Sequence, residues 1–194
     1  NKLLESKEIL SQDALIELIP PYPATKAIKN TLKNFDDDTA NKLAKIVFGD
    51  EANENTKLRT HQAESLERSL RDSQECNLVV TSGTGSGKTE SFLLPIIARV
   101  IKERLGKEAP KINDWWNSPP EKNSNVWTGL RKKTNDSYEA SLKSIILYPT
   151  NALVEDQLSR IRQAAFRAKK INNGNPLFYF GRYTGHTPGG MYYP

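Results

Sequence analysis

The stretch TSGTGSGKTE at residues 81–90 constrains the fold more than any other part of the chain. It follows a short apolar run, NLVVT at 77–81, and precedes a helix-like segment over residues 88–105. Three glycines in it permit backbone dihedrals that a Cβ would forbid, so that successive amides can point inward around phosphate groups. These glycines are Gly83, Gly85 and Gly87. A strand, a glycine-rich turn and a helix in this order predict a phosphate-binding loop.

Two side chains at the end of the loop have the chemistry that a bound nucleotide requires. Lys88 supplies a mobile ammonium for the β and γ phosphates, and Thr89 supplies a hydroxyl ligand for Mg²⁺. The helix that begins near Lys88 adds the positive end of its dipole. The alternative is a flexible glycine turn that binds nothing, which rarely takes this form. Ser82 is a modest departure from the general pattern G-x-x-x-x-G-K-S/T, which has glycine at that position.

The later part of the chain alternates strand-like and helix-like segments. We expect strands at SIILYP (144–149) and PLFYF (176–180), with a helix over residues 151–166 between them. Strand, helix, strand, helix and strand imply right-handed crossovers and a parallel sheet. Residues 106–141 are polar and rich in turn-forming residues, which predicts an insertion. The expected fold class is α/β, with an incomplete parallel sheet built around the phosphate loop.

The N-terminal part of the chain has a different pattern. Residues 1–55 are expected to form a helical segment, and residues 56–194 the nucleotide-binding domain, whose first helix has the sequence LRTHQAESLERSL. Within the segment, apolar residues recur at helical spacing at Ala40, Leu43, Ala44 and Val47. Pro95 is expected to interrupt and bend the helix that follows the phosphate loop.

Composition narrows the class of protein. The net charge of +5 and the isoelectric point near 9.2 suit a nucleic-acid partner, although such values are also common in proteins that bind none. The single cysteine, Cys76, excludes an internal disulfide and fits the reducing cytoplasm. No apolar run approaches the roughly 20 residues that span a bilayer, so we expect no membrane partner. Because the chain starts at Asn1 and stops at Pro194 in turn-like sequence, we expect a fragment of a longer protein.

Three stretches, in order along the chain, resemble motifs of the superfamily 2 DEAD/DEAH-box helicases. SGTGSGKT at 82–89 looks like motif I, which often reads A/S/G-x-T-G-S-G-K-T and therefore accounts for Ser82. LRTHQ at 58–62 resembles the Q motif. LYPTNALVEDQ at 147–157 resembles motif Ia of MrfA/YprA-like and phage-defence-type large helicases. The resemblance covers residues 58–189 and implies the first RecA-like domain of an ATP-dependent helicase or translocase.

The resemblance also implies ATP and Mg²⁺ as cofactors. Gln62 would pair with the N6 and N7 edge of adenine, which would make the protein use ATP rather than GTP. A lone His-Gln pair opening a helix is more often structural, but its spacing from the loop favours the functional interpretation. The implied nucleotide-binding residues are Arg59, Gln62, Gly83, Thr84, Gly85, Ser86, Gly87, Lys88, Thr89 and Glu90, among which Lys88 and Thr89 are catalytic and Thr89 holds Mg²⁺.

Nucleic-acid contacts are expected in two places. Motif Ia would follow a strand and head a helix, where Thr150 and nearby amides can hold a phosphate, although capping or helix-surface roles are about as plausible for each residue. The second place is FGRYTGHTPG at 180–189, which resembles a segment of the same helicases but could also be a plain turn. The implied nucleic-acid residues are Pro149, Thr150, Asn151, Gln157, Thr184, Gly185 and Thr187.

The sequence lacks part of the helicase machinery. DEAN at 50–53 imitates a DEAD box but precedes the phosphate loop, and no acidic motif follows motif Ia. A second RecA-like domain, expected as a partner within the longer protein, would supply arginine fingers. We therefore expect these 194 residues to bind ATP weakly and to hydrolyse it negligibly. DNA is favoured over RNA because the resembling helicases act on DNA. Two other functions remain open: a P-loop remodeller without a nucleic-acid role, and a non-catalytic scaffold in a defence or repair complex with further subunits.

Overall fold

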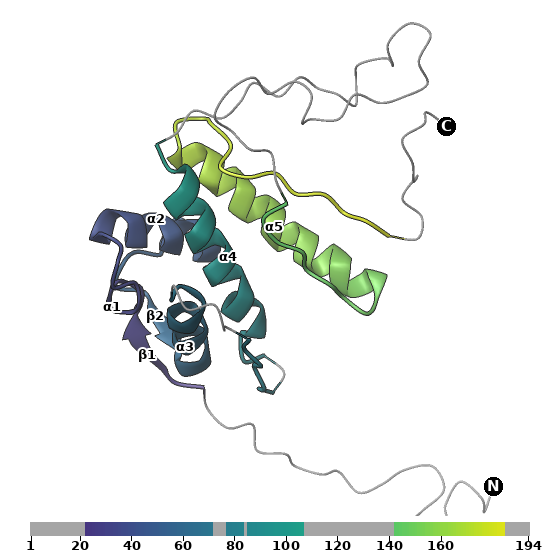
Figure 1. Ribbon diagram of the computed structural model, residues 1–194, viewed down its shortest axis with the longest axis horizontal. Coiled ribbons are helices and arrows are strands. Elements are labelled where there is room, and N and C mark those ends of the chain that lie inside the picture. The colour runs from purple at the N-terminus through teal and green to yellow at the C-terminus, as the bar shows by residue number, and fades with distance from the viewer. Residues whose placement is uncertain (1–21, 72–76, 84, 107–141, 185–194) are drawn as a thin grey trace, which may run out of the picture.

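The structure is a computed structural model that describes residues 22–71, 77–83, 85–106 and 142–184. Residues 1–21, residues 107–141 of the insertion predicted over 106–141, and the segment after residue 184 lie outside these residues. The elements, drawn in Figure 1, are β1 (Ala24–Ala27), α1 (Ile28–Thr31), α2 (Asp37–Phe48), β2 (Lys57–Arg59), α3 (Thr60–Ser69), α4 (Lys88–Arg104) and α5 (Asn151–Ile171). The helices predicted after residue 56 are confirmed, and α5 extends further than its predicted end.

Helix α4 organises the core. It packs against α3 and α2, and in Figure 1 it runs between α3 and α5. Its buried face carries Leu94, Ala98 and Ile101, which belong to the same hydrophobic cluster as Leu66 of α3. The helix ends as predicted, with a left-handed Gly106 (φ 76°) shortly after its last residue. Because α4 begins directly after the phosphate loop, this core holds the loop in place.

Pro95 does not interrupt α4, contrary to the sequence-based expectation. The helix is continuous from Lys88 to Arg104. Proline has no N–H, so the carbonyl of Ser91, four residues earlier, loses its helical hydrogen-bond donor. The hydroxyl of the buried Ser65, on α3, donates to that carbonyl instead. A side chain from the neighbouring helix therefore satisfies the group that the proline leaves without a partner.

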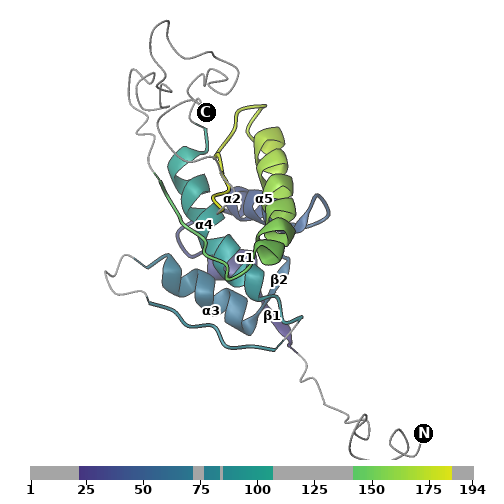
Figure 2. The same ribbon diagram turned by 90° about the vertical axis from the view of Figure 1, so that its right-hand side faces the viewer.

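Helix α2 has a capped N-terminus and is hydrogen-bonded to α5 near its other end. Asp36 caps its first turn, accepting a hydrogen bond from the Thr39 amide at 2.6 Å. Hydrogen bonds from Thr39, first from its side chain and then from its amide, lower the pKa of the Asp36 carboxyl. Near the other end, Arg167 of α5 donates to the Ile46 carbonyl at 3.1 Å. Figure 2 shows α2 behind α4 and α5, spanning the space between them.

The sequence led us to expect a helical segment over residues 1–55, but the described part of this region also contains a strand. Strand β1 pairs antiparallel with β2, with Lys26 opposite Leu58 and Ala27 opposite Lys57. Leu58 is fully buried, which anchors this small sheet to the core. The pairing and the packing of α2 both cross the expected domain boundary at residues 55 and 56. The division of the chain at that boundary stays a prediction.

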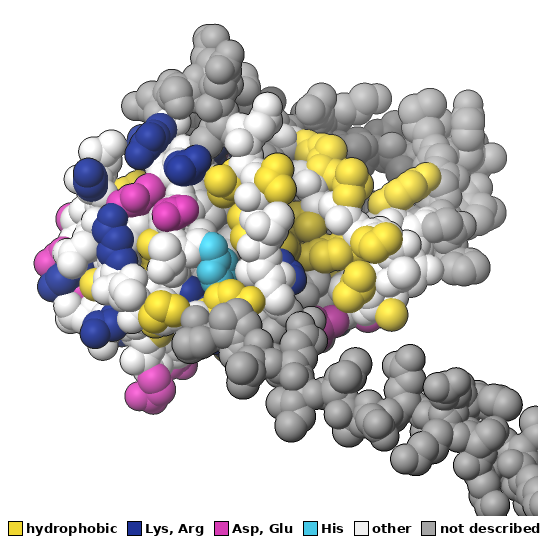
Figure 3. Space-filling model, turned by 90° about the horizontal axis from the view of Figure 1, so that it is seen from below, with side chains coloured by type: hydrophobic (Ala, Val, Ile, Leu, Met, Phe, Trp, Pro, Cys, Tyr) yellow, Lys and Arg dark blue, Asp and Glu magenta, His cyan; other side chains and the backbone are white. Residues whose placement is uncertain are grey.

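Residues 77–81, 144–149 and 176–180 form no strand in the structure, so the predicted parallel sheet is not confirmed. The sheet of the described residues is the antiparallel β1–β2 pair. The physical reason is that a strand depends on neighbours, and two of these segments leave an apolar side chain in solvent: Val79 is 85% exposed and Leu147 is 86% exposed. On the face drawn in Figure 3, hydrophobic side chains gather on one side. None of the described helices is long and apolar enough to cross a membrane.

Candidate nucleotide and nucleic-acid site

The phosphate loop has the backbone that its glycines predict at two positions. Gly85 has φ 73° and Gly87 has φ 77°, both in the left-handed region that favours glycine. Between them Ser86 is buried, and its Oγ lies 2.6 Å from the Oγ of Ser82. The hydroxyl that departs from the general P-loop pattern is therefore part of the folded loop. Thr84, also expected to bind nucleotide, lies outside the described residues.

Gly83 differs from these two glycines, because its φ is not in the left-handed region and the tip of a side chain, Tyr22, lies close to it instead. A Cβ on Gly83 would come 2.8 Å from the hydroxyl oxygen of Tyr22. The Gly83 amide donates to that oxygen at 2.7 Å. The Tyr22 ring lies under the Arg59 guanidinium, 5.9 Å from ring centroid to Cζ, and makes a T-shaped contact with the His61 ring. Sequence reasoning missed Tyr22, since no local pattern connects a tyrosine in PPYPAT with a loop 61 residues later.

Lys88 folds back over the loop. Its ammonium donates to the carbonyl oxygens of Ser82 and, at 3.2 Å, Gly83. These neutral acceptors hold the ammonium at the mouth of the loop, where phosphate oxygens would be stronger acceptors because they carry charge. Thr89 and Glu90 complete the first turn of α4, next to the helix N-terminus. The loop therefore combines a cation, amides and a helix start at one point.

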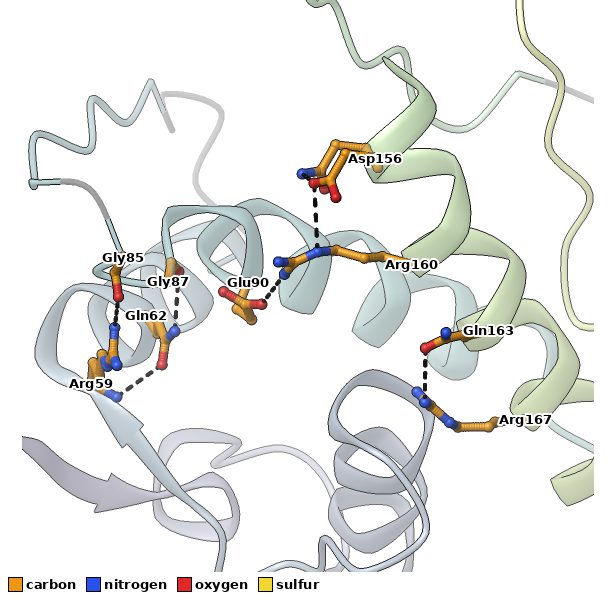
Figure 4. A network of polar contacts seen from close by, with 10 residues as sticks. Arg59, Gln62, Gly85, Gly87, Glu90, Asp156, Arg160, Gln163 and Arg167 are labelled. Carbon is orange, nitrogen blue, oxygen red and sulfur yellow. Dashed lines mark hydrogen bonds and ion pairs between the residues drawn. The ribbon is translucent and has the colours of Figure 1, made fainter. Parts of the chain in front are cut away.

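Gln62 and Arg59 contact the loop directly (Figure 4). The Gln62 Nε2 donates to the Gly87 carbonyl at 3.0 Å, and its Oε1 accepts from the Arg59 amide at 2.9 Å. The Arg59 guanidinium donates to the Gly85 carbonyl at 2.7 Å. The start of α3 is thus tied to two carbonyls of the loop. The spacing argument that singled out Gln62 brought together segments that are indeed neighbours in space.

The expected role of Gln62 in reading adenine remains a prediction. The side chain is only 5% exposed, and both ends of its amide already have a protein partner. A primary amide has a second N–H and a second carbonyl lone pair. Gln62 could therefore bind adenine through its second N–H and its second lone pair while it keeps both hydrogen bonds to the protein. Those two bonds also fix which end of the amide is oxygen.

An ion pair joins the loop region to α5. The Nη1 of Arg160 donates to Glu90 Oε1 at 2.7 Å, and the Nε of Arg160 lies 3.9 Å from Asp156 on the same helix (Figure 4). Glu90 was an expected nucleotide ligand, and here its carboxylate faces an arginine of the helix headed by motif Ia. Sequence reasoning missed this contact, because Glu90 and Arg160 are 70 residues apart in the chain.

The expected nucleic-acid residues divide into two groups. Pro149, Thr150 and Asn151 are exposed where α5 begins, with Thr150 at the N-cap position. Gln157 is buried, and its Nε2 donates to Asp156 at 3.0 Å. Thr184 is half-buried at the edge of the described residues, and Gly185 and Thr187 lie outside them. The first group is therefore exposed at the start of α5, whereas Gln157 is buried.

Tyr148, next to motif Ia, is half-buried, and burial followed by the charge of Asp156 raises the pKa of its phenol. It therefore keeps its proton throughout the physiological range.

The residues present fit a nucleoside triphosphate. The left-handed glycines, the free end of α4 and the Lys88 ammonium supply the donors and the positive charge that phosphates need. Gln62, the residue predicted to read the base, contacts the same loop. For a metal, Thr89 stays the predicted ligand, and the described residues contain no group of three His, Cys, Asp or Glu side chains that could hold an ion without further ligands.

Comparison with known proteins agrees with this geometry. The model of the DEAD/DEAH box helicase family matches residues 59–177. The Druantia protein DruE of Escherichia coli is 33% identical over 192 residues, which are 96% of this chain and 9% of that protein. The mitochondrial ATP-dependent RNA helicase MRH4 of Candida albicans is 30% identical over 106 residues, 53% of this chain and 16% of that protein. No solved structure matches significantly. The chain belongs to the DEAD/DEAH-box helicase family.

Proposed function

We propose that this chain is the ATP-binding part of an ATP-dependent helicase or translocase that acts on DNA. The observation that carries the proposal is the contact between the start of α3 and the phosphate loop, where Arg59 and Gln62 bind the Gly85 and Gly87 carbonyls. A P-loop alone would fit many NTPases. A buried glutamine joined to the loop adds a group that can distinguish the base.

In the proposed complex, each group has a defined task. The amides of the loop and the start of α4 hold the β and γ phosphates, and Lys88 exchanges its two carbonyl acceptors for phosphate oxygens. Bound Mg²⁺ would neutralise phosphate charge, and Thr89 would be one of its ligands. The remaining donor and acceptor of the Gln62 amide face adenine. A second RecA-like domain of the longer protein would complete the site and supply arginine fingers.

The nucleic acid would bind at the start of α5. Thr150, Asn151 and the first amides of α5 are exposed and lie at a helix N-terminus, which suits one phosphate of the backbone. Such contacts recognise backbone rather than sequence. We propose DNA as the polymer and phage defence or repair as the setting, on the resemblance to phage-defence helicases and the match to DruE over nearly the whole chain.

The test is ATP turnover by the full-length protein with no nucleic acid, with duplex DNA, with single-stranded DNA and with single-stranded RNA. We expect DNA to stimulate turnover. Lys88→Ala should lower the stimulated rate by about a hundredfold or more, as expected for loss of a preorganised group that stabilises charge. Lys102→Ala is the matched control, because Lys102 is exposed in the last turn of the same helix. It should leave turnover unchanged.

The other outcomes identify the rival functions. Turnover that ignores every nucleic acid would favour a P-loop remodeller, and no turnover at all would favour a scaffold in a larger complex. Stimulation by RNA rather than DNA would make the protein an RNA helicase, the activity named for the MRH4 relative. Each result contradicts the DNA proposal in a different arm of the same assay.

A further inference from the structure

The carboxylate of Glu90 lies between the phosphate loop and α5. Its Oε1 accepts from Arg160 at 2.7 Å. Its Oε2 lies 3.0 Å from the point that a Cβ on Gly87 would occupy, where Gln62 and Arg59 also approach. In Figure 4 the side chains form one series, from Arg59 and Gln62 through the loop glycines and Glu90 to Arg160. Glu90 therefore lies beside the phosphate loop and is paired with the helix headed by motif Ia.

Arg160 is held in place on its own helix. Asp156, one turn earlier on α5, lies 3.9 Å from its Nε, so the guanidinium sits between two carboxylates from two helices. Helix α5 runs without a break from Asn151 to Ile171. A displacement at its exposed first turn would therefore move Arg160, because a helix behaves as one rigid element over this length.

The contribution of this pair to stability should be small. The Arg160 side chain is 49% exposed and that of Glu90 is 18% exposed, and ion pairs with a solvated partner contribute little to folding. Removing the arginine should therefore leave the fold intact. Its effect can then be measured at the nucleotide site without the complication of unfolding.

We propose that Arg160 is a positioning residue that couples the phosphate loop to nucleic acid bound at the start of α5, acting through Glu90. The inference rests on the proposed function. When the first turn of α5 binds a phosphate, Arg160 sets the position of the Glu90 carboxylate and hence of the first turn of α4. That turn carries Lys88 and Thr89, so nucleotide affinity depends on whether α5 is occupied. By linkage, nucleotide changes nucleic-acid affinity by the same factor.

The experiment measures the affinity of the full-length protein for a fluorescent ATP analogue, with and without the oligonucleotide that best stimulates turnover. We expect the oligonucleotide to tighten binding in the wild type by about fivefold or more, the lower end of ordinary allosteric coupling. Arg160→Gln should remove this tightening while leaving the affinities for analogue alone and oligonucleotide alone within about twofold. Arg160→Lys, which keeps the charge, should restore part of it.

Two further variants separate the proposed pair from a general effect of charge. Arg162→Gln removes an exposed arginine from the same helix and should keep the full tightening. Adding Glu90→Gln to Arg160→Gln should cause no further loss of coupling, because both changes break one contact.

Full tightening in Arg160→Gln would overturn the inference, and so would a wild type whose analogue affinity ignores the oligonucleotide. Failure of the proposed function looks different, because it appears as absent or nucleic-acid-independent turnover in the wild type.

Discussion

At Gly87 two separate constraints meet on one residue. Its φ of 77° lies in the left-handed region, and a Cβ there would collide with the Gln62 amide and crowd Glu90 Oε2 at 3.0 Å. Gly106 has nearly the same φ, 76°, but open space around it. Comparing alanine substitutions at the two glycines therefore separates the free-energy cost of backbone strain from that of the side-chain clash.

We expect Gly87→Ala to lower nucleotide affinity strongly, because it pushes Gln62 away from the loop as well as straining the backbone. The backbone part is about 1–2 kcal/mol for a residue with a Cβ in this conformation. Gly106→Ala should show that part alone, as a similar loss of unfolding free energy with unchanged nucleotide affinity. Calorimetric titration with ATP and denaturant unfolding check both. Equal nucleotide affinity in the two variants would contradict the contact-based explanation.

At the scale of the elements, a hydrogen bond from Ser65 of α3 to the Ser91 carbonyl of α4 joins the two helices beside Pro95. The Ser65 hydroxyl donates to the Ser91 carbonyl, whose partner four residues later, Pro95, has no amide hydrogen. Ser65→Ala should therefore cost about 1–3 kcal/mol of unfolding free energy, the usual cost of a buried polar group without a partner. Denaturant unfolding of the chain measures it.

The double variant tests the cause. An alanine at position 95 restores the N–H that α4 lacks, so Pro95→Ala should recover more stability in the Ser65→Ala background than in the wild type. Additive effects of the two changes would mean that the hydroxyl and the proline act independently, so that the serine does not compensate for the missing amide.

An element could be predicted from the sequence when its hydrogen bonds lie within the element itself. Helices α3, α4 and α5 bond within themselves, so periodicity and the glycines found them. Strands β1 and β2 bond to each other although α1 and α2 lie between them in the chain, and ATKA and KLR have no local strand signal. The contacts of Tyr22 and Arg160 with the loop were missed for the same reason, because both partners are distant in sequence. For the predicted parallel strands, an apolar sequence could not show whether a second strand lies beside each of them.

At the scale of the whole molecule, the described residues bury one hydrophobic cluster while leaving apolar side chains such as Val79 and Leu147 in solvent. The chain spans 9% of DruE and 16% of MRH4. The matched family region includes the phosphate loop and motif Ia, so both candidate binding points fall within the part that the family shares. We therefore expect nucleotide binding and nucleotide hydrolysis to be separable in experiments on this chain.

We expect the 194-residue chain to bind ATP but to turn it over negligibly, whether or not DNA is present. Its sequence offers no acidic motif after motif Ia to hold Mg²⁺ and orient water, and a missing arginine finger alone lowers rates by about 10³–10⁵. Calorimetric titration measures binding, and phosphate release measures turnover, with the full-length protein as the positive control. Appreciable DNA-stimulated turnover by the chain alone would contradict this expectation.

The double attachment of Gln62 has a consequence for genetics. One amide accepts from the Arg59 backbone at the start of α3 and donates to the Gly87 carbonyl. A null phenotype at this position would therefore be ambiguous, since the allele could have lost base preference, loop shape or the helix start. Only the ratio of ATP to GTP use within a single mutant, rather than the size of its defect, would reveal whether this glutamine reads the base.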